Sequence, residues 1–344
     1  MSSRKRESAV TAVQRFDVST VPTFRPRAPW WGADLQTLRN VLPGGAPGVA
    51  LQGTEQLSLP LLDETGDVLS ASLNHPDTAA GSDNPLIVLI HGLSGSDESA
   101  YILASADYWL ARGHRVLRLN LRGAGSSRAT CSQQYHAGRT QDLRDALSGL
   151  PHTLTTRGVV LVGYSLGGNM LLKFLAEYGS GFHIHAAASV SAPIDLAAAS
   201  ERFLDRRNWV YHQHLLRNMK RECFGGTAEI SAAERMTISA CKSIYEFDEL
   251  VVAPRNGYRD AAHYYWENHS RRQLERIETP TLLVHAMNDP WIPSAAYTSY
   301  PWHENPHLHP LLTSGGGHVG FHAGTTDVPY HDHCIGEFLD AVTG

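Results

Sequence analysis

The sequence contains little cysteine and no long apolar run. Its four cysteines are scattered through 344 residues, and none of them forms a CxxC pair. Such a pattern offers no disulfide framework and favours a reducing compartment. No stretch of about 18 apolar residues is present, and the N-terminal segment lacks an apolar core, so we expect neither a membrane span nor a secretory signal. These absences together predict a cytoplasmic protein without stable membrane insertion.

A strong net charge is also missing. The formal net charge is −5 at pH 7, which favours neither nucleic acid nor an anionic membrane as a partner. One short basic cluster, Arg4, Lys5 and Arg6, stands beside Glu7 in a polar tail, and we interpret it as a solvated terminus. The sequence therefore predicts a protein that binds no nucleic acid, and it leaves the oligomeric state open.

The sequence does contain a regular alternation of apolar strands and helices. Two short runs at about 56–62 and 68–74 are separated by a turn, which is typical of an antiparallel hairpin. Further strands are predicted at 85–90, 115–121, 158–164, 183–190, 280–286 and 308–313, and helices at 99–112, 139–150, 166–178 and 330–342. A continuously apolar strand such as 85–90 is typical of a strand covered on both faces. The alternation predicts an α/β fold with a mostly parallel central sheet and helices on both faces.

The alternation lapses between two strands of this predicted sheet. Residues 194–272 are rich in arginine, tyrosine and tryptophan, and their pattern is mainly helical. We therefore interpret them as an insertion that forms a cap. The predicted organisation is an N-terminal arm (1–54), a first part of the core (55–193), the cap insertion (194–272) and a second part of the core (273–344).

A nucleophile motif lies at the end of the strand 158–164. The run from Gly163 through Ser165 to Gly167 has the pattern G-x-S-x-G, and it joins a buried strand directly to a helix. In this context the chain turns sharply and lifts the serine hydroxyl above the sheet, at a helix N-terminus whose dipole favours negative charge. We predict that Ser165 is a catalytic nucleophile; the alternative is a glycine-rich turn with a capping serine.

A serine nucleophile requires a base, which in this arrangement follows an acid along the chain. Nineteen histidines are present, so residue type alone does not identify the base. His318 follows three glycines directly after the last predicted strand, where a flexible loop can carry an imidazole over the sheet edge. Asp289 lies three residues after the strand 280–286, at the edge where sites in open α/β sheets lie. We predict His318 as the base and Asp289 as the acid that orients its imidazole.

Alternatives remain for both residues. Asp195, just past the strand 183–190, is a rival acid, and Asp289 also suits an Asx turn before Pro290. The rival histidines are His303, His307, His309 and His322.

The loop after the strand 85–90 is a candidate oxyanion hole. It begins with His91 and Gly92, and a backbone N–H from such a loop can bind the oxyanion together with the N–H of the residue after the nucleophile. We predict Leu93 and Leu166 as these two donors. His91 itself is interpreted as a buried histidine that is satisfied by the backbone. The glycine-containing loop 122–127 lacks the lysine of a phosphate-binding loop and opens no helix, so we interpret it as structural.

The density of histidines near the C-terminus raises the question of a metal. Seven histidines fall within residues 303–333, but HExxH is absent and no helical spacing unites a ligand set. Histidines that are solvated in loops or that line a pocket explain the cluster as well as a metal site does. We predict neither a metal nor another cofactor.

The motifs in this order resemble the YheT-like branch of the α/β-hydrolases, relatives of mammalian medium-chain phospholipid hydrolases and yeast ethanol acyltransferases. The similarity runs from about Phe24 to Phe321 and rests on the motifs beginning at Phe24, Gln36, His91, Asn120, Tyr135, Gly163, Asn288 and Gly315. The resemblance implies the α/β-hydrolase fold and the same assignment of nucleophile, acid and base. One departure is that Asp34 replaces the histidine that relatives usually carry two residues before the Gln-Thr pair, which leaves the role of the arm open.

These observations predict an enzyme whose partner is a small-molecule ester. We expect a serine esterase that cleaves carboxylic esters of short to medium acyl chains through an acyl-serine intermediate. An acyltransferase that passes the acyl group to an alcohol would use the same three residues, and a non-catalytic binding protein of this fold is a third possibility. The acyl chain length and the alcohol portion depend on the shape of the pocket, which the cap insertion would largely set.

Overall fold

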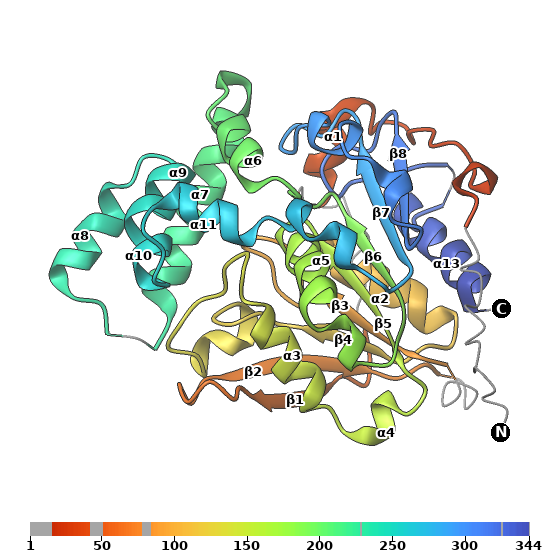
Figure 1. Cartoon of the computed structure of the whole chain (residues 1–344), viewed down its shortest axis with the longest axis horizontal. Helices are drawn as coiled ribbons and strands as arrows, with labels where there is room; N and C mark the ends of the chain where they lie inside the picture. The colour runs from red at the N-terminus through yellow and green to blue at the C-terminus, as the bar shows by residue number, and fades with distance from the viewer. Residues whose placement is uncertain (1–15, 42–50, 78–83, 228, 325, 344) are drawn as a thin grey trace, which may run out of the picture.

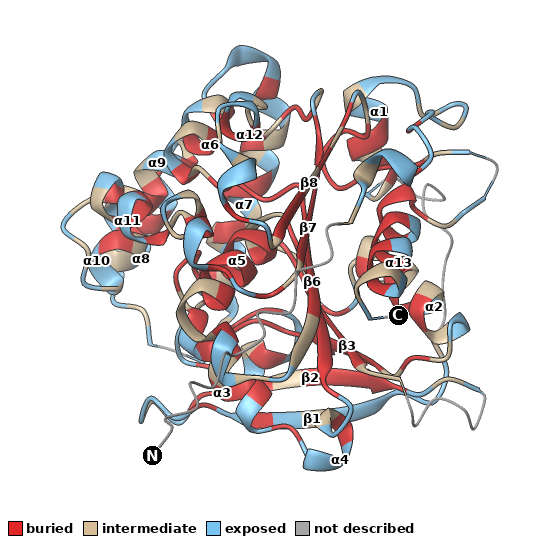
Figure 2. Cartoon of the chain, turned by 45° about the vertical axis from the view of Figure 1, so that its right-hand side comes forward, coloured by how far each residue is buried: buried red, intermediate tan, exposed pale blue. Residues whose placement is uncertain are grey.

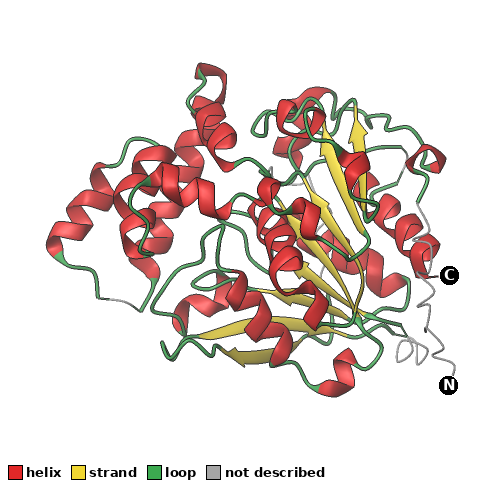
Figure 3. Ribbon diagram, viewed as in Figure 1, coloured by secondary structure: helices red, strands yellow, loops and turns green. Residues whose placement is uncertain are grey.

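One eight-stranded sheet runs through the part of the chain that the structure describes. The structure is a computed structural model, and it describes residues 16–41, 51–77, 84–227, 229–324 and 326–343. The basic cluster at Arg4, Lys5 and Arg6 lies outside these residues. The strand order is β1-β2-β4-β3-β5-β6-β7-β8, and the sheet twists across the molecule (Figure 1 and Figure 3). The strands are β1 (Glu55–Pro60), β2 (Val68–Asn74), β3 (Leu86–Ile90), β4 (Val116–Leu119), β5 (Val159–Tyr164), β6 (Ile184–Val190), β7 (Thr281–Ala286) and β8 (Leu308–Thr313).

The directions of the strands confirm the predicted α/β architecture. Strand β2 pairs in antiparallel register with both β1 and β4, whereas all neighbouring pairs from β4 to β8 are parallel. Strand β3 lies between β4 and β5, so the chain leaves β3 toward one side and later returns on the other. The carboxyl ends of β3 and β5 therefore flank a topological switch point, where ligands bind in open α/β sheets.

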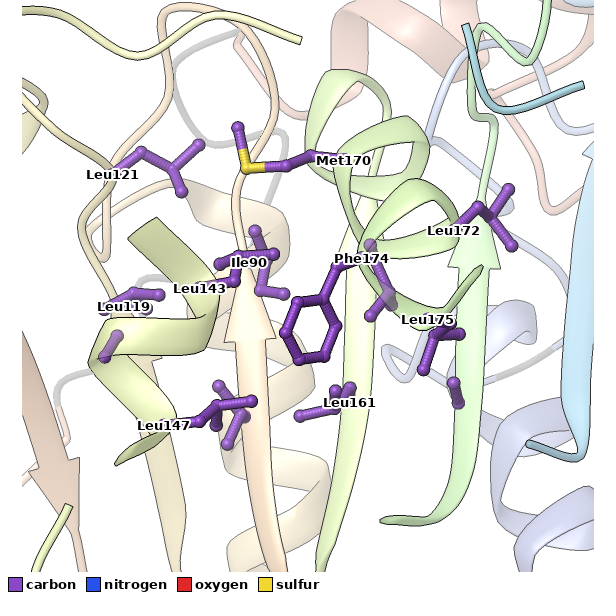
Figure 4. Close-up of a cluster of buried hydrophobic side chains, with 14 of the residues drawn as sticks. Ile90, Leu119, Leu121, Leu143, Leu147, Leu161, Met170, Leu172, Phe174 and Leu175 are labelled. Atoms are coloured by element: carbon purple, nitrogen blue, oxygen red, sulfur yellow. The ribbon is translucent and has the colours of Figure 1, made fainter. Parts of the chain in front are cut away.

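Two hydrophobic cores lie on the two faces of this sheet. In β3, Leu86, Val88 and Ile90 belong to one core, whereas Ile87 and Leu89 belong to the other, because successive side chains of a strand point to opposite faces. This explains why the strand reads as continuously apolar. Figure 4 shows part of the first core, where side chains from strands and helices interdigitate.

Helices cover both faces of the sheet, as predicted. Helices α3 (Thr140–Ser148) and α5 (Leu166–Tyr178) lie over one face, and α2 (Ala100–Ala111) and α13 (Tyr330–Thr343) lie over the other (Figure 2). Two shorter helices, α4 (His152–Thr155) and α12 (Ala295–Thr298), lie in the connections. Among the helices of the described residues, none combines the length and the apolar character that crossing a membrane requires.

The segment between β6 and β7 is helical and forms a lobe beside the sheet (Figure 1). It has a small hydrophobic core of its own, to which Leu215, Leu216, Ile238 and Phe247 contribute. Its α-helices are α6 (Leu196–Phe203), α7 (Trp209–Gly225), α8 (Ala232–Ala240), α9 (Ile244–Phe247), α10 (Ala253–Arg255) and α11 (Ala261–Asn268). We call residues 194–272 the insertion; their division from the core as a separate domain stays a prediction.

The N-terminal arm contributes one α-helix to the described structure, α1 (Gly32–Arg39). This helix packs against the loop that follows β8. A Cβ atom added to Gly317 would lie 2.4 Å from the Ala33 carbonyl oxygen, and one added to Gly320 would lie 2.5 Å from that of Gln36. Only glycine permits such close approach of two backbones, so the glycines of this loop seat α1 against it.

Candidate active site

Ser165 occupies a sharp turn between β5 and α5. Its backbone dihedrals are φ 51° and ψ −122°, a conformation that costs energy for any residue other than glycine. The turn is possible because its neighbours are small. A Cβ atom on Gly163 would lie 2.6 Å from the Gly167 carbonyl oxygen, and one on Gly167 would lie 2.3 Å from that of His91. Local strain is thus held by the surrounding chain, and the Ser165 side chain projects at the start of a helix.

His318 connects Ser165 to Asp289. The imidazole Nε2 atom lies 2.9 Å from the Ser165 Oγ atom, and the Nδ1 atom lies 2.9 Å from the Asp289 Oδ2 atom. The side chains of His318 and Asp289 are only 4% and 0% exposed, so this pair is shielded from water. The structure therefore brings together the three residues that the sequence analysis selected from loops after β5, β7 and β8.

Asp289 uses its two carboxylate oxygens for different partners. Its Oδ1 atom accepts hydrogen bonds from the backbone N–H groups of Trp291 (2.8 Å) and Ile292 (3.0 Å), which closes an Asx turn. Its Oδ2 atom remains for the imidazole of His318. The two interpretations of Asp289 are thus compatible. The rival acid Asp195 instead caps α6, where its side chain accepts from the backbone N–H of Ala198 at 3.1 Å.

The loop that carries His318 is tightly wound. Gly316 and Gly317 have φ angles of 138° and 59°, which favour glycine. Trp291 stacks on the imidazole of His318, with ring centroids 4.2 Å apart. The rival His322 faces away toward the arm, where its ring contacts Asn40 and Arg39. Of the remaining rivals, His309 packs against Phe338 of α13, and the His307 backbone N–H donates to the Asn305 side chain.

The arm supplies a contact to the candidate base that sequence reasoning missed. The Thr37 Oγ1 atom of α1 accepts a hydrogen bond from the backbone N–H of His318 at 2.8 Å. The same hydroxyl donates to the Ala33 carbonyl oxygen at 2.8 Å. Asp34, which departs from the family pattern, also belongs to α1. Its carboxylate binds the insertion through Arg207 (3.0 Å) and the Tyr211 hydroxyl (3.0 Å). The helix α1 therefore joins the loop of the candidate base to the insertion.

Replacement of Thr37 by valine is expected to lower kcat/KM about 2- to 10-fold, because one hydrogen bond to the His318 backbone is lost. The rate of Ser165 labelling by a fluorophosphonate should fall by the same factor. Thr298→Val is the matched control, since the Thr298 hydroxyl also bonds the carbonyl four residues earlier but lies on the surface. Equal labelling rates for the two variants at equal thermal stability would contradict a positioning role of Thr37.

The candidate oxyanion donors lie beside Ser165. Leu166 is the first residue of α5, and its N–H has no partner within the helix because the first N–H groups of a helix never do. In the neighbouring loop, the Gly92 N–H donates to the Tyr101 hydroxyl (2.9 Å) and the Ser94 N–H donates to the Tyr135 hydroxyl (2.7 Å). For Leu93 between them, the described structure contains no hydrogen-bond partner of the N–H. The two predicted donors are thus placed beside the serine without other partners.

Two polar motifs near the site have structural roles. Burial lowers the pKa of His91 to about 4, so the ring is neutral; its Nε2 atom accepts from the Leu121 N–H, and its Nδ1 atom donates to the Gly92 carbonyl. Arg122 is fully buried and binds the carboxylates of Asp63, Asp67 and Asp142. Both motifs fix loops at the sheet edge, as the sequence analysis expected.

A cavity of about 310 Å³ opens next to Ser165. Leu93, Leu166 and Trp291 border it on the side of the sheet. Its far wall consists mainly of apolar side chains from the insertion, namely Leu196, Phe203, Leu215, Met219, Ile244, Phe247 and Val251. No group of three His, Cys, Asp or Glu side chains within the described ranges is arranged to hold a metal ion. Beside the cavity lie a serine, an imidazole and a carboxylate in hydrogen-bond contact with one another.

Comparison with known proteins places this architecture in a class. A family model described as "alpha/beta hydrolase fold" matches residues 85–240. The esterase Pf2001 of Pyrococcus furiosus has a similar structure, with a TM-score of 0.56 at 17% identity, over 85% of this chain and 93% of that chain. The fold and the strand–serine–helix turn thus define an α/β-hydrolase.

Sequence relatives specify the family. The putative esterase YheT of Escherichia coli is 34% identical over 253 residues, which are 72% of this chain and 73% of that protein. Human phospholipase ABHD3 is 27% identical over 270 residues, 76% of this chain and 65% of that protein. A medium-chain fatty acid ethyl ester synthase/esterase of Saccharomyces cerevisiae is 26% identical over 70% of this chain and 58% of that protein. The chain belongs to the YheT-like family of α/β-hydrolases.

Proposed function

We propose that this carboxylic-ester hydrolase cleaves its substrate through an acyl-serine intermediate on Ser165. The contact that supports the proposal most is the 2.9 Å approach of the His318 Nε2 atom to the Ser165 Oγ atom beside a largely apolar cavity. With the Nδ1 proton shared with Asp289, Nε2 is the basic nitrogen and accepts the serine proton as Oγ attacks the ester carbonyl. The activated serine replaces the alcohol portion of the ester, which leaves with the proton from His318.

The negative charge that develops on the carbonyl oxygen needs hydrogen-bond donors. We assign this role to the N–H groups of Leu93 and Leu166, which have fixed positions before the reaction begins. The N-terminus of α5 adds a favourable dipole at the same place. Water then attacks the acyl-serine with His318 as base, and the carboxylic acid is released. In this mechanism the imidazolium formed on His318 offsets the negative charge of the oxyanion. We therefore propose that the reaction uses no metal or other cofactor.

Acyl transfer to an alcohol is the second candidate function. It is favoured by one relative, whose name describes both a synthase of fatty acid ethyl esters and an esterase. The two functions differ only in the molecule that attacks the acyl-serine. Product analysis with a medium-chain ester in the presence of added ethanol distinguishes them: hydrolysis gives the free acid, whereas transfer gives the ethyl ester at the expense of the acid. A binding protein without catalysis would give neither product and no labelling of Ser165 by a fluorophosphonate.

We further propose that the insertion acts as a cap that selects short to medium acyl chains. Of the aromatic residues of the insertion, Phe203, Phe247, Tyr264 and Tyr265 line the cavity, whereas Trp209 and Trp266 are exposed. A largely apolar wall helps to exclude water and limits the length of acyl chain that fits. A cavity of about 310 Å³ suits a limited acyl chain better than the three chains of a triglyceride.

Replacement of Phe247 by leucine is expected to shift the preference to esters with longer acyl chains, because the smaller side chain leaves more room in the cavity. One methylene group in such a pocket changes the free energy of binding by about 1–3 kcal/mol, so the shift should be graded. The measurement is kcat/KM for a series of p-nitrophenyl esters of increasing length. Labelling of Ser165 by a small fluorophosphonate should persist.

Trp209→Leu is the matched control for this experiment, because Trp209 belongs to the insertion but is 64% exposed. It should retain the chain-length profile of the wild type. If Phe203→Leu and Phe247→Leu also keep that profile, the insertion does not determine acyl selectivity.

We also propose a cytoplasmic location, which the four free cysteines favour.

A further inference from the structure

The loop that carries Leu93 contains a strained residue. Residues 92–95 form a turn closed by a hydrogen bond from the Gly95 N–H to the Gly92 carbonyl oxygen (3.1 Å). Its third residue, Ser94, has a φ angle of 56°, a left-handed conformation that a turn normally assigns to glycine or asparagine. Such a conformation persists only where surrounding contacts hold it. The contacts of Ser94 therefore determine how the preceding N–H of Leu93 is oriented.

Tyrosine hydroxyls anchor the amides on both sides of Leu93. Tyr101 accepts from the Gly92 N–H, and Tyr135 accepts from the Ser94 N–H at 2.7 Å. Tyr135 is itself fixed at its ring, which packs edge-on against the imidazole of His91 with centroids 5.8 Å apart. The second anchor therefore depends on the orientation of one phenolic O–H group.

A carboxylate from the insertion defines that orientation. The Tyr135 hydroxyl donates to the Glu222 Oε2 atom of α7 at 3.3 Å. The Glu222 side chain is only 13% exposed, and its charged neighbour is Arg128, at 4.0 Å from the Oε1 atom. Tyr135, Glu222 and Leu93 all border the cavity that contains Ser165. An interaction chain thus runs from α7 of the insertion to the proposed oxyanion hole.

We propose that Tyr135 and Glu222 are positioning residues that hold the Leu93 N–H toward the reacting carbonyl. The inference rests on the proposed role of Leu93 in the ester hydrolysis described above. A phenol has one proton to donate. When Glu222 is ionised and receives it, the lone pairs of the Tyr135 oxygen are directed to the Ser94 N–H, and the negative charge strengthens that acceptor. The insertion then contributes to the rate of the reaction as well as to the shape of the pocket.

Burial makes this arrangement sensitive to pH. It raises the pKa of Glu222 to about 7, while burial also raises the pKa of Tyr135 well above its usual value, so the phenol keeps its proton. The other titratable groups near Glu222 come from three segments. They are Arg128 in the segment that follows β4, Cys223 beside Glu222 on α7, and Arg255 of α10, which contacts the Cys223 thiol. Above about pH 7 Glu222 is ionised and orients Tyr135; below that pH it is protonated and the orientation is weakened.

The first test replaces Tyr135 by phenylalanine. Loss of one oxyanion donor costs about 100- to 1,000-fold in kcat, and a misplaced donor costs less, so we expect a fall of about 10- to 100-fold with little change in KM. A trifluoromethyl ketone, which forms a tetrahedral adduct with the serine, should lose affinity by the same factor. The corresponding methyl ketone, which does not need the oxyanion hole, should bind as it does to the wild type.

Tyr258→Phe is the matched control, because it also removes a hydroxyl hydrogen bond, to Asn268. It should leave the inhibition by both ketones unchanged. Equal weakening of the two ketones by Tyr135→Phe would mean that Tyr135 only shapes the pocket, and wild-type behaviour would mean that it has no role. Either result overturns the inference. Neither affects the proposed function, which instead falls if Ser165→Ala retains activity.

The second test replaces Glu222 by glutamine, which keeps an acceptor for Tyr135 but removes the charge. The ratio of wild-type to variant kcat/KM at each pH cancels every ionisation that the two proteins share. We expect this ratio to be about 10 well above the pKa of Glu222 and to approach 1 well below it, with a midpoint near pH 7. A ratio that does not change with pH would contradict the role of the Glu222 charge.

Discussion

Replacement of Ser165 by alanine is expected to abolish ester hydrolysis, with a fall in kcat on the order of 10⁶-fold, as found when a serine hydrolase loses its nucleophile. The change removes the atom that forms the acyl intermediate, so only the much smaller rate enhancement from substrate binding and the backbone donors remains. The fold should persist, because alanine fits the same turn and the strain at φ 51° is unchanged. Steady-state kinetics with a medium-chain ester and labelling by a fluorophosphonate measure the loss, and thermal unfolding measures the fold.

Ser299→Ala provides the control for this experiment. The Ser299 hydroxyl lies on the surface, where it bonds the Ala295 carbonyl, and its removal should leave kcat unchanged. If the kcat of Ser165→Ala lies within about 100-fold of the wild-type value, Ser165 is not the nucleophile.

Replacement of Asp289 by asparagine is expected to lower kcat about 10⁴-fold. The amide oxygen can still accept from Trp291 and Ile292 and so preserve the turn, but the amide nitrogen then donates to His318 Nδ1. The imidazole proton is thereby moved to Nε2, where it prevents the base from accepting the serine proton. Kinetics across the pH range, with thermal unfolding as the measure of stability, separate this loss of function from a loss of fold.

Asp195→Asn is the matched control, since it makes the same chemical change in the rival acid. Asparagine caps helices about as well as aspartate, so α6 and the activity should both be retained. A larger loss of activity in Asp195→Asn than in Asp289→Asn would assign the role of the acid to Asp195, in the loop after β6, instead of Asp289.

Elements with a strong local pattern could be predicted from the sequence. The strand β5 and the helix α5 have continuous apolar and helical patterns, and the two glycines around Ser165 require a turn that only small residues permit. Asp289 and His318 follow from the chain order of the hydrolase motif together with their places after β7 and β8. Each of these inferences uses a local motif or the position of a residue just after a strand, at the one edge that the carboxyl ends of parallel strands share.

Contacts between distant segments could not be predicted in the same way. Thr37 binds the backbone of a residue 281 positions away, and nothing in the Gln-Thr pair itself indicates that partner. Glu222 lies on the helix α7, and nothing in the sequence around it distinguishes it from a solvent-exposed glutamate. Its contact with Tyr135 depends on how the insertion packs against the sheet. Tertiary packing determines such contacts, and a single sequence does not reveal it.

The contact between α1 and the His318 loop has a consequence for the order of folding. It joins residues near the two ends of the described chain, and contacts of such high sequence separation form late because a long loop must close first. A chain whose sheet and pocket are complete still lacks the support that α1 gives to the His318 loop until this closure occurs. Full hydrolytic activity is therefore expected to return only after the burial of the sheet during refolding, so that the final gain in activity reports the docking of α1 rather than the formation of the core.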